Sequence, residues 1–163
     1  MGPLALLRRY AAVAREEIRR DFAPDSCVVS TRITLAVFKR FGIRGQPMPA
    51  ELLVQNDQHA ILMQAERPDE VGHVVAWLGK SWLVDASLDQ AERPAKDLYL
   101  PAVFYCAAPR FPRRAVSGTL AIDGREVRLI YEARPHWKAF ETAPDWLEPW
   151  RWGPVVERIL RRM

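Results

Sequence analysis

The feature that most constrains the fold is the order of two periodicities, with helical spacing at the start of the chain and β-rich runs after it. Apolar residues recur at helical intervals over residues 3–20, between arginines and glutamates, which predicts an amphipathic helix. Residues 26–41 are apolar nearly all round and predict a central helix, with Asp25 or Ser26 as its N-cap and Gly42 just past its end.

The β-rich part carries two hairpin signals. Gly79-Lys80 and Asp123-Gly124 are dipeptides suited to tight turns, and each lies between two β-rich runs. Strands are expected at residues 51–56, 60–64, 72–78, 81–86, 99–107, 116–122 and 127–133. Irregular structure is expected in the Gly- and Pro-rich segment 44–49, in the polar segment 87–97 and in the aromatic segment 135–152, with a short basic helix at 155–163.

Helices followed by a mostly antiparallel sheet predict the α+β class. The length of 163 residues suits one domain, with a core over about 22–134 and a C-terminal aromatic and basic extension at 135–163. Hydrophobic residues make up 49% of the chain, which is typical of a globular rather than a disordered protein.

The expected compartment is the cytoplasm, with thiols reduced. Two cysteines, Cys27 and Cys106, are too few for a disulfide-built scaffold. No apolar stretch approaches the roughly 18 residues of a membrane span. Where a signal peptide would need an unbroken apolar core, the chain carries Arg8, Arg9, Arg15, Glu16 and Glu17.

The basic charge does not by itself predict a nucleic-acid partner. The net charge is +4, and the isoelectric point is about 9.4. The arginines are spread along the chain, whereas nucleic-acid binders usually gather their charge on one face or stripe. A nucleic-acid binder would therefore need these arginines to meet on one face of the fold and would show a steep dependence on salt.

Cys27 lies at the first turn of the second predicted helix, in the segment 24–29. The unpaired N–H groups and the dipole at a helix N-terminus favour a thiolate, and the same N–H groups can hold a developing oxyanion. This position therefore suits a catalytic nucleophile. The alternative is a small buried hydrophobic residue, as most free cysteines are.

His73 and Asp85 lie on the two strands of the first predicted hairpin. Alternation gives His73 the face of Val75 and Trp77, and a two-residue turn at 79–80 places Asp85 opposite about residue 74. The acid would then lie beside the imidazole, where it can orient the ring and stabilise the imidazolium. Cys27, His73 and Asp85 together predict a catalytic triad for acyl transfer.

The order of a helix-opening Cys27, a His73 on one strand and an Asp85 on the next resembles the transglutaminase-like branch of the papain-like cysteine enzymes. The spacings of 46 and 12 residues are similar to that branch, and the resemblance covers about residues 22–90. It implies a nucleophile, a base and an orienting acid in that order, on a Cys-bearing helix packed on an antiparallel sheet. It also implies a thioester intermediate and a peptidase, amidase, deamidase or transferase acting on a protein or peptide amide or a small acyl donor.

Several other polar residues are weaker candidates. Asn56 and Gln90 lie near predicted strand ends and are possible oxyanion or substrate contacts, and Asp89 is an alternative orienting acid. Cys106 is expected in the core. His59 and His136 are isolated, no paired cysteine spacing is present, and the glycines do not cluster into a phosphate loop. No metal or other cofactor is therefore expected.

The C-terminal extension is rich in tryptophan and proline. Trp137, Trp146, Trp150 and Trp152 lie close together in sequence and are expected to pack across the sheet and close the core. Exposed aromatic residues also mark partner-binding surfaces. The second hypothesis is therefore an inactive protein-binding module on the same fold, in which this stretch meets a protein partner and Cys27 is inert.

Overall fold

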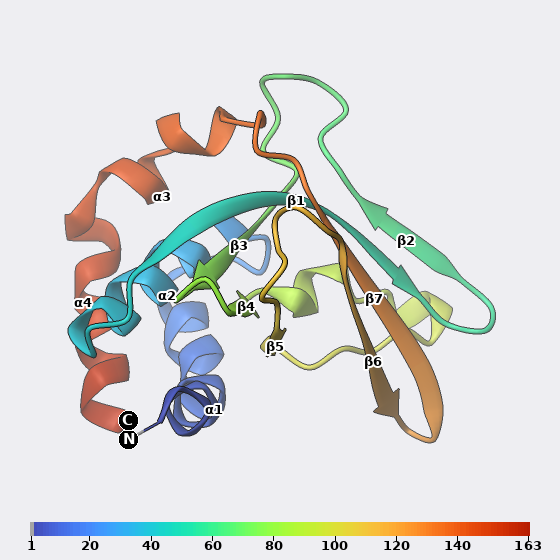
Figure 1. Ribbon diagram of the computed structural model, residues 1–163, viewed down its shortest axis with the longest axis horizontal. Helices are drawn as coiled ribbons and strands as arrows, with labels where there is room; N and C mark the ends of the chain where they lie inside the picture. The colour runs from blue at the N-terminus through green and yellow to red at the C-terminus, as the bar shows by residue number, and fades with distance from the viewer. Residues whose placement is uncertain (1) are drawn as a thin grey trace.

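Helices open and close the chain, and strands occupy its middle (Figure 1). The structure is a computed structural model that describes residues 2–163. The long helices are α1 (Pro3–Asp21), α2 (Cys27–Arg40) and α4 (Pro149–Arg162). The strands are β1 (Gly45–Gln55), β2 (Ala60–Met63), β3 (His73–Leu78), β4 (Trp82–Asp85), β5 (Phe104–Ala107), β6 (Val116–Ile122) and β7 (Arg125–Ala133). The short helices are η1 (Leu88–Ala91), η2 (Pro94–Lys96), η3 (Ala139–Thr142) and α3 (Pro144–Leu147).

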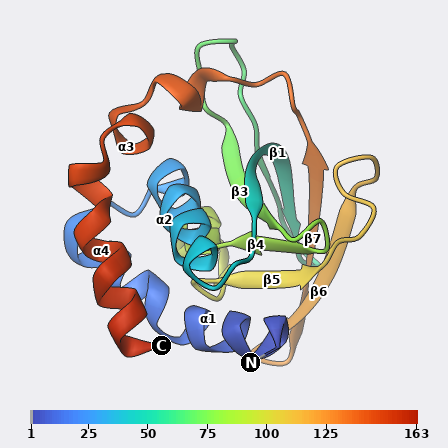
Figure 2. The same ribbon diagram turned by 60° about the vertical axis from the view of Figure 1, so that its left-hand side comes forward.

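All seven strands form one antiparallel sheet in the order β5-β4-β3-β1-β7-β6, with β2 paired to β1. The sheet curls until its two ends nearly meet (Figure 2). A Cβ placed on Gly118 of β6 would come within 2.7 Å of the Phe104 ring of β5. The predicted α+β class with a mostly antiparallel sheet is confirmed.

Each face of the curled sheet covers its own core. Even-numbered residues of β3 and β4, such as Ala76 and Val84, face α1, α2 and α4. Odd-numbered residues, such as Val75 and Leu83, face the inside of the curl together with Tyr131. This alternation is the period of two expected for strands that are buried on both faces. α2 lies between the sheet and α4, which makes it the central helix that its apolar sequence predicts.

The Gly- and Pro-rich segment 44–49, expected to be a loop, is instead mostly strand, because it forms the first half of β1 and pairs with β3. The carbonyl oxygen of Arg44 accepts a hydrogen bond from Gly79 N, so the even-numbered residues here direct their backbone groups toward β3. Pro47 and Pro49 face the other edge, where β7 pairs with β1 only from Ala50 onward. The prolines therefore remove no hydrogen bond from the β1–β3 ladder.

The register of the β3–β4 hairpin is shifted by one residue from the prediction. Leu78 lies opposite Trp82 rather than Ser81. Continued by one residue beyond Val84, this register places Asp85 opposite Val75 rather than opposite residue 74. The cause is Ser81, whose N–H closes the turn onto Leu78 O but whose carbonyl accepts from Ala108 N beyond β5. Because opposed residues point to one face, this shift puts Asp85 on the face of His73.

Three other predicted boundaries move. The strand expected at 99–107 is shorter and consists of β5 alone. It begins after Pro101, because proline has no N–H to donate to a ladder. The helix expected at 155–163 already begins at Pro149, where a helix needs no N–H donor. The segment 87–97 contains η1 and η2.

The two ends of the chain are tied together by a buried acid. Glu17 of α1 is 1% exposed and pairs with Arg158 and Arg162 of α4 at 2.9 and 2.5 Å. Hydrogen bonds from Arg162 hold the pKa of the Glu17 carboxyl below its usual value despite burial. The C-terminal helix is therefore part of the domain core rather than a loose extension.

Replacing Gly45 by alanine is expected to destabilise the fold, because its Cβ would lie 2.9 Å from the Trp77 carbonyl oxygen in the neighbouring strand. The expected loss in free energy of unfolding is about 1–3 kcal/mol. The matched change Gly153→Ala in α4 meets nothing within 4 Å and should gain up to about 1 kcal/mol in a helix. Urea unfolding of both variants tests the register of β1, and equal stabilities would contradict it.

Candidate active site

Cys27 is the first residue of α2, as the sequence predicts. The N-cap residue Ser26 makes no side-chain bond to the helix N–H groups, and its Oγ instead accepts a hydrogen bond from Arg15 at 2.9 Å. One turn further on, Thr31 donates to the carbonyl of Val74 at 2.8 Å. That bond ties the beginning of α2 to the beginning of β3, and so brings Cys27 toward His73.

His73 begins β3 and is fully buried. Its Nε2 lies 2.7 Å from Oδ2 of Asp85. Its Nδ1 lies 2.7 Å from Nε2 of Gln90 in η1, and the side chain of Cys27 is near enough to the ring to raise the pKa of His73. The fold thus brings Cys27, His73, Asp85 and Gln90 into one cluster.

Asp85 ends β4 with both carboxylate oxygens occupied. Oδ1 accepts from the backbone N–H and the hydroxyl of Ser87 at 3.0 and 3.2 Å. Oδ2 accepts from the Tyr131 hydroxyl at 2.9 Å, besides its contact with His73. A fully buried carboxylate is tolerated only when it is bonded in this way.

The electrostatics of the buried pair favour its charged form. Burial alone would lower the pKa of His73, but the Asp85 carboxylate, together with the side chain of Cys27, outweighs burial and raises that pKa to about 10. Burial would likewise raise the pKa of Asp85, and the charge of His73 together with the donors from Ser87 and Tyr131 lowers it. At neutral pH the pair is therefore an imidazolium and a carboxylate.

The amide of Gln90 must suit the charge of the ring. A neutral ring accepts at Nδ1 and needs the amide N–H, whereas an imidazolium donates at Nδ1 and needs the amide oxygen. A half-turn of the amide exchanges the two. Gln90 can therefore follow the protonation of His73 without moving its backbone.

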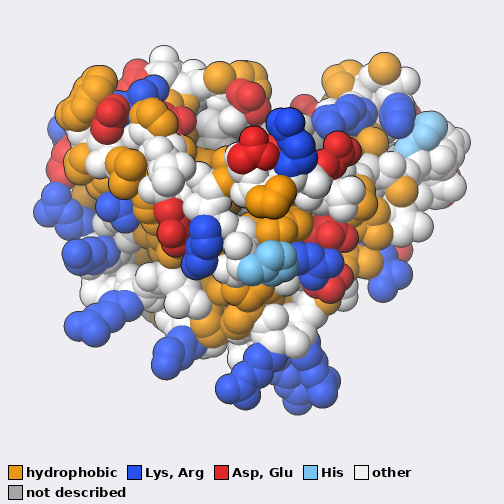
Figure 3. Space-filling view, turned by 90° about the horizontal axis from the view of Figure 1, so that it is seen from above, with side chains coloured by type: hydrophobic (Ala, Val, Ile, Leu, Met, Phe, Trp, Pro, Cys, Tyr) orange, Lys and Arg blue, Asp and Glu red, His pale blue; other side chains and the backbone are white. Residues whose placement is uncertain are grey.

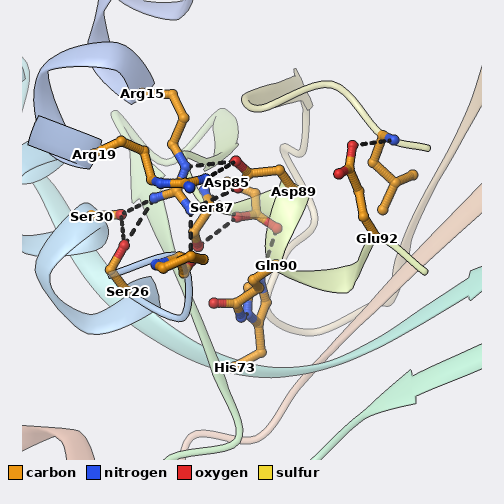
Figure 4. A network of polar contacts seen from close by, with 12 residues as sticks. Arg15, Arg19, Ser26, Ser30, His73, Asp85, Ser87, Asp89, Gln90 and Glu92 are labelled. Atoms are coloured by element: carbon orange, nitrogen blue, oxygen red, sulfur yellow. Dashed lines mark hydrogen bonds and ion pairs between the residues drawn. The ribbon is translucent and has the colours of Figure 1, made fainter. Parts of the chain in front are cut away.

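A second buried network holds the pieces of the site together (Figure 4). Arg15 of α1 is 5% exposed and forms an ion pair with Asp89 of η1 at 2.8 Å. The same guanidinium donates to Ser26 Oγ, to Ser30 Oγ and to the carbonyl of Pro24. One arginine thus joins the loop before Cys27 to the short helix that carries Gln90.

The structure separates the weaker candidates. Asn56 accepts from the N–H groups of Gln58 and His59 in the β1–β2 turn, and lies six residues beyond the Ala50 position paired with His73, about 20 Å along β1. Asp89 is bound to Arg15 and does not orient His73. Cys106 is half-buried in β5, where burial raises its pKa to about 11.

Three residues of the site were missed by sequence reasoning: Ser87, Tyr131 and Arg15. An Asp followed two residues later by Ser is a local turn signal, so the contact of Ser87 with Asp85 could have been predicted from the sequence. Tyr131 reaches Asp85 from 46 residues away, and Arg15 reaches Asp89 from 74 residues away. No local pattern marks either contact.

Aromatic residues from the C-terminal extension cover the thiol. Phe140 and Trp146 pack on Cys27, Val28 and Val74, and Cys27 is 7% exposed. The sequence predicts that the extension packs across the sheet. It lies instead over the start of α2 and β3. Trp137 also lies against Gly72, where an added Cβ would come within 2.9 Å of its ring.

Within residues 2–163, no three His, Cys, Asp or Glu side chains are grouped as metal ligands. No helix in that range is both long and apolar enough to cross a bilayer.

Comparisons with known proteins give no match to any family model, to any curated protein or to any solved structure.

Replacing Arg15 by methionine is expected to destabilise the protein by roughly 3–5 kcal/mol, because it leaves a mostly buried carboxylate on Asp89 without its main partner. The control Arg67→Met breaks only exposed pairs with Asp69 and Glu70 and should change stability by at most about 1 kcal/mol. Urea unfolding measures both. Similar losses for the two variants would show that Arg15 has no special structural role.

The charge of His73 can be observed directly by NMR of its ring nitrogens. With a pKa raised to about 10, the ring should still be an imidazolium at about pH 8. Asp85→Asn removes the opposing charge, so burial should then leave a neutral ring at the same pH. Tyr131→Phe keeps the carboxylate and should keep the imidazolium. A neutral ring in the unmodified protein would contradict the assignment.

Proposed function

We propose that this protein is a cysteine-dependent acyl-transfer enzyme with Cys27 as nucleophile, His73 as base and Asp85 as the acid that orients His73. One observation carries the proposal. A fully buried imidazole is held by a carboxylate 2.7 Å from its Nε2, and the side chain of the helix-opening Cys27 is near enough to this ring to raise its pKa. A nucleophile, its base and an orienting third group are the parts that such catalysis needs.

In the first half of the reaction, the Cys27 thiolate attacks the carbonyl carbon of an amide, and the electrons of the C=O bond move onto oxygen. Collapse of this intermediate breaks the C–N bond. The leaving amine displaces the Gln90 amide and takes the proton from Nδ1 of His73, since Nε2 is held by the buried carboxylate of Asp85. The products of this half are a thioester on Cys27, a free amine and a neutral imidazole.

In the second half, water or an amine attacks the thioester while His73 takes its proton at Nδ1. The C–S bond breaks and returns the Cys27 thiolate beside a charged His73. The product is a carboxylic acid when water attacks and a new amide when an amine attacks. The high pKa of His73 suits this cycle, because the imidazolium carries the proton that the leaving amine needs.

We infer that two groups stabilise the oxyanion. The backbone N–H groups of the first turn of α2, beginning with Cys27, have no partner within the helix. The amide of Gln90 lies against Nδ1 of His73, on the side where the proton must move. Donors at a developing oxyanion are worth about 3–4 kcal/mol each in acyl transfer.

The transglutaminase-like branch of the papain-like enzymes is the class we propose for this chain. The support is the order Cys27, His73, Asp85 on a helix start, a strand start and the end of the next strand. An antiparallel sheet packed against the Cys-bearing helix also agrees with that class. The proposed substrates are protein or peptide amides or small acyl donors.

The cover over Cys27 favours a second candidate function. With the thiol 7% exposed beneath Phe140, and with His73 and Asp85 fully buried, the same residues would suit an inert core. The protein would then be a binding module, and its exposed Trp150 and Leu147 would contact a protein partner. Reactivity of the thiol separates the two functions.

Alkylation by iodoacetamide tests the enzyme proposal. At about pH 7, Cys27 should react faster than Cys106 and at least roughly tenfold faster than in the His73→Ala variant, because a paired thiolate is the reactive form. Mass spectrometry identifies the labelled residue. Cys106 is the internal control, since its raised pKa keeps it a thiol.

The variant Phe140→Ala, checked for folding by circular dichroism, separates low reactivity from poor access. It opens the cover and should accelerate labelling of Cys27 while leaving Cys106 unchanged. If Cys27 reacts no faster than Cys106 in both backgrounds, the enzyme proposal is wrong and the binding module stands.

A further inference from the structure

A groove of about 1060 Å³ runs beside α2, away from the buried His73–Asp85 pair. Its walls are α2, the start of α4, Trp146 of α3 and the first residues of β1. This volume is larger than most small-molecule sites require. An extended chain is therefore a better fit than a compact ligand.

The lining of the groove is basic. Arg32, Lys39, Arg40 and Arg44 line it, and Glu157 is the acidic residue among its walls. Arg40 pairs with Glu157 at 2.7 Å. Within residues 2–163, no carboxylate lies within ion-pair distance of the other three basic side chains, so the groove favours an anionic occupant.

The guanidinium of Arg32 is fixed in an orientation that suits binding of a planar anion such as a carboxylate. Its guanidinium stacks between Trp146 and Trp152, with centroid distances of 4.8 and 5.0 Å. Its buried Nε has no hydrogen-bond partner in the described chain, and neither does the buried Nε1 of Trp152. A guanidinium fixed by stacking loses little entropy when it binds a carboxylate.

The open edge of β1 suits the backbone of a peptide. Gly45 and Pro47 line the groove, and their backbone groups face the edge that β7 does not reach. Pro47 has no N–H, so this edge presents mainly carbonyl oxygens. They can accept from the N–H groups of an extended peptide, which a phosphate or a nucleic acid backbone does not offer.

We infer that this groove binds an extended acidic peptide. Trp146 joins the groove to the site, because it lines the groove and also packs in the cluster of Cys27 and Phe140. A peptide bound along α2 with a carboxylate at Arg32 would lie against Trp146, which packs in the cluster that covers Cys27. The inference rests on the proposed function and names its substrate class, which is an amide within an acidic peptide segment.

Binding is tested in the Cys27→Ala variant, which cannot form a thioester. The probes are two fluorescein-labelled peptides of about ten residues, about 33 Å when extended, one with alternating glutamates and one with glutamines in their place. Fluorescence anisotropy at low and moderate salt should show tighter binding of the glutamate peptide, weakened by salt. Arg32→Gln should weaken it roughly tenfold, as expected for loss of a charge-assisted hydrogen bond.

Arg113→Gln is the matched control, since Arg113 is exposed and remote from the groove walls. It should change binding by less than about twofold. Arg32→Lys keeps the charge but loses the planar fork, and should fall between the unmodified protein and Arg32→Gln. Thermal melts show that each variant is folded.

Equal affinity for the two peptides, or equal effects of Arg32→Gln and Arg113→Gln, would overturn the inference. Tighter binding of a single-stranded oligonucleotide than of the glutamate peptide would also overturn it. Failure of the groove and failure of the enzyme proposal are distinguishable. Fast alkylation of Cys27 that depends on His73, without a preference for the glutamate peptide, would count against the groove alone.

Discussion

The structure depends on the burial of the Asp85 carboxylate, because a charge without water must find all its partners inside the protein. Those partners come from three places in the chain: His73 on β3, Ser87 just after β4 and Tyr131 on β7. The curl of the sheet brings these segments together. A single carboxylate thus orients His73 and favours its charged form. Its partners can all reach it only because the sheet curls around it.

The arginine network gives the same site its second fixed point. Arg15 comes from a helix that carries no proposed catalytic residue, yet it bonds both to the loop before Cys27 and to Asp89 beside Gln90. Cys27 and Gln90 are therefore placed relative to each other by one guanidinium. Stability and the geometry of the site are coupled here, since a buried ion pair tolerates little displacement.

The surface accords with a peptide partner more than with a nucleic acid. On the face shown in Figure 3, Lys and Arg side chains are spread over the surface and its rim, with acidic side chains among them. In the groove, by contrast, the unpaired basic side chains line the same surface as two tryptophans and the edge of β1. Such a surface suits binding of a peptide backbone as well as of acidic side chains.

Local patterns in the sequence were sufficient for the α+β order, the helix start at Cys27, the Asp123-Gly124 hairpin and the placement of Asp85 beside His73. They failed where a distant strand decided the outcome. Residues 45–49 are strand because β3 pairs with the edge that the prolines leave intact, and the β3–β4 register shifts because Ser81 bonds beyond β5. The roles of Tyr131 and Arg15, the cover by Phe140 and the groove along α2 arise only when remote segments meet. Periodicity and turn chemistry act over a few residues and are written in the sequence, whereas the partners of a buried charge are chosen by the packing of the whole chain.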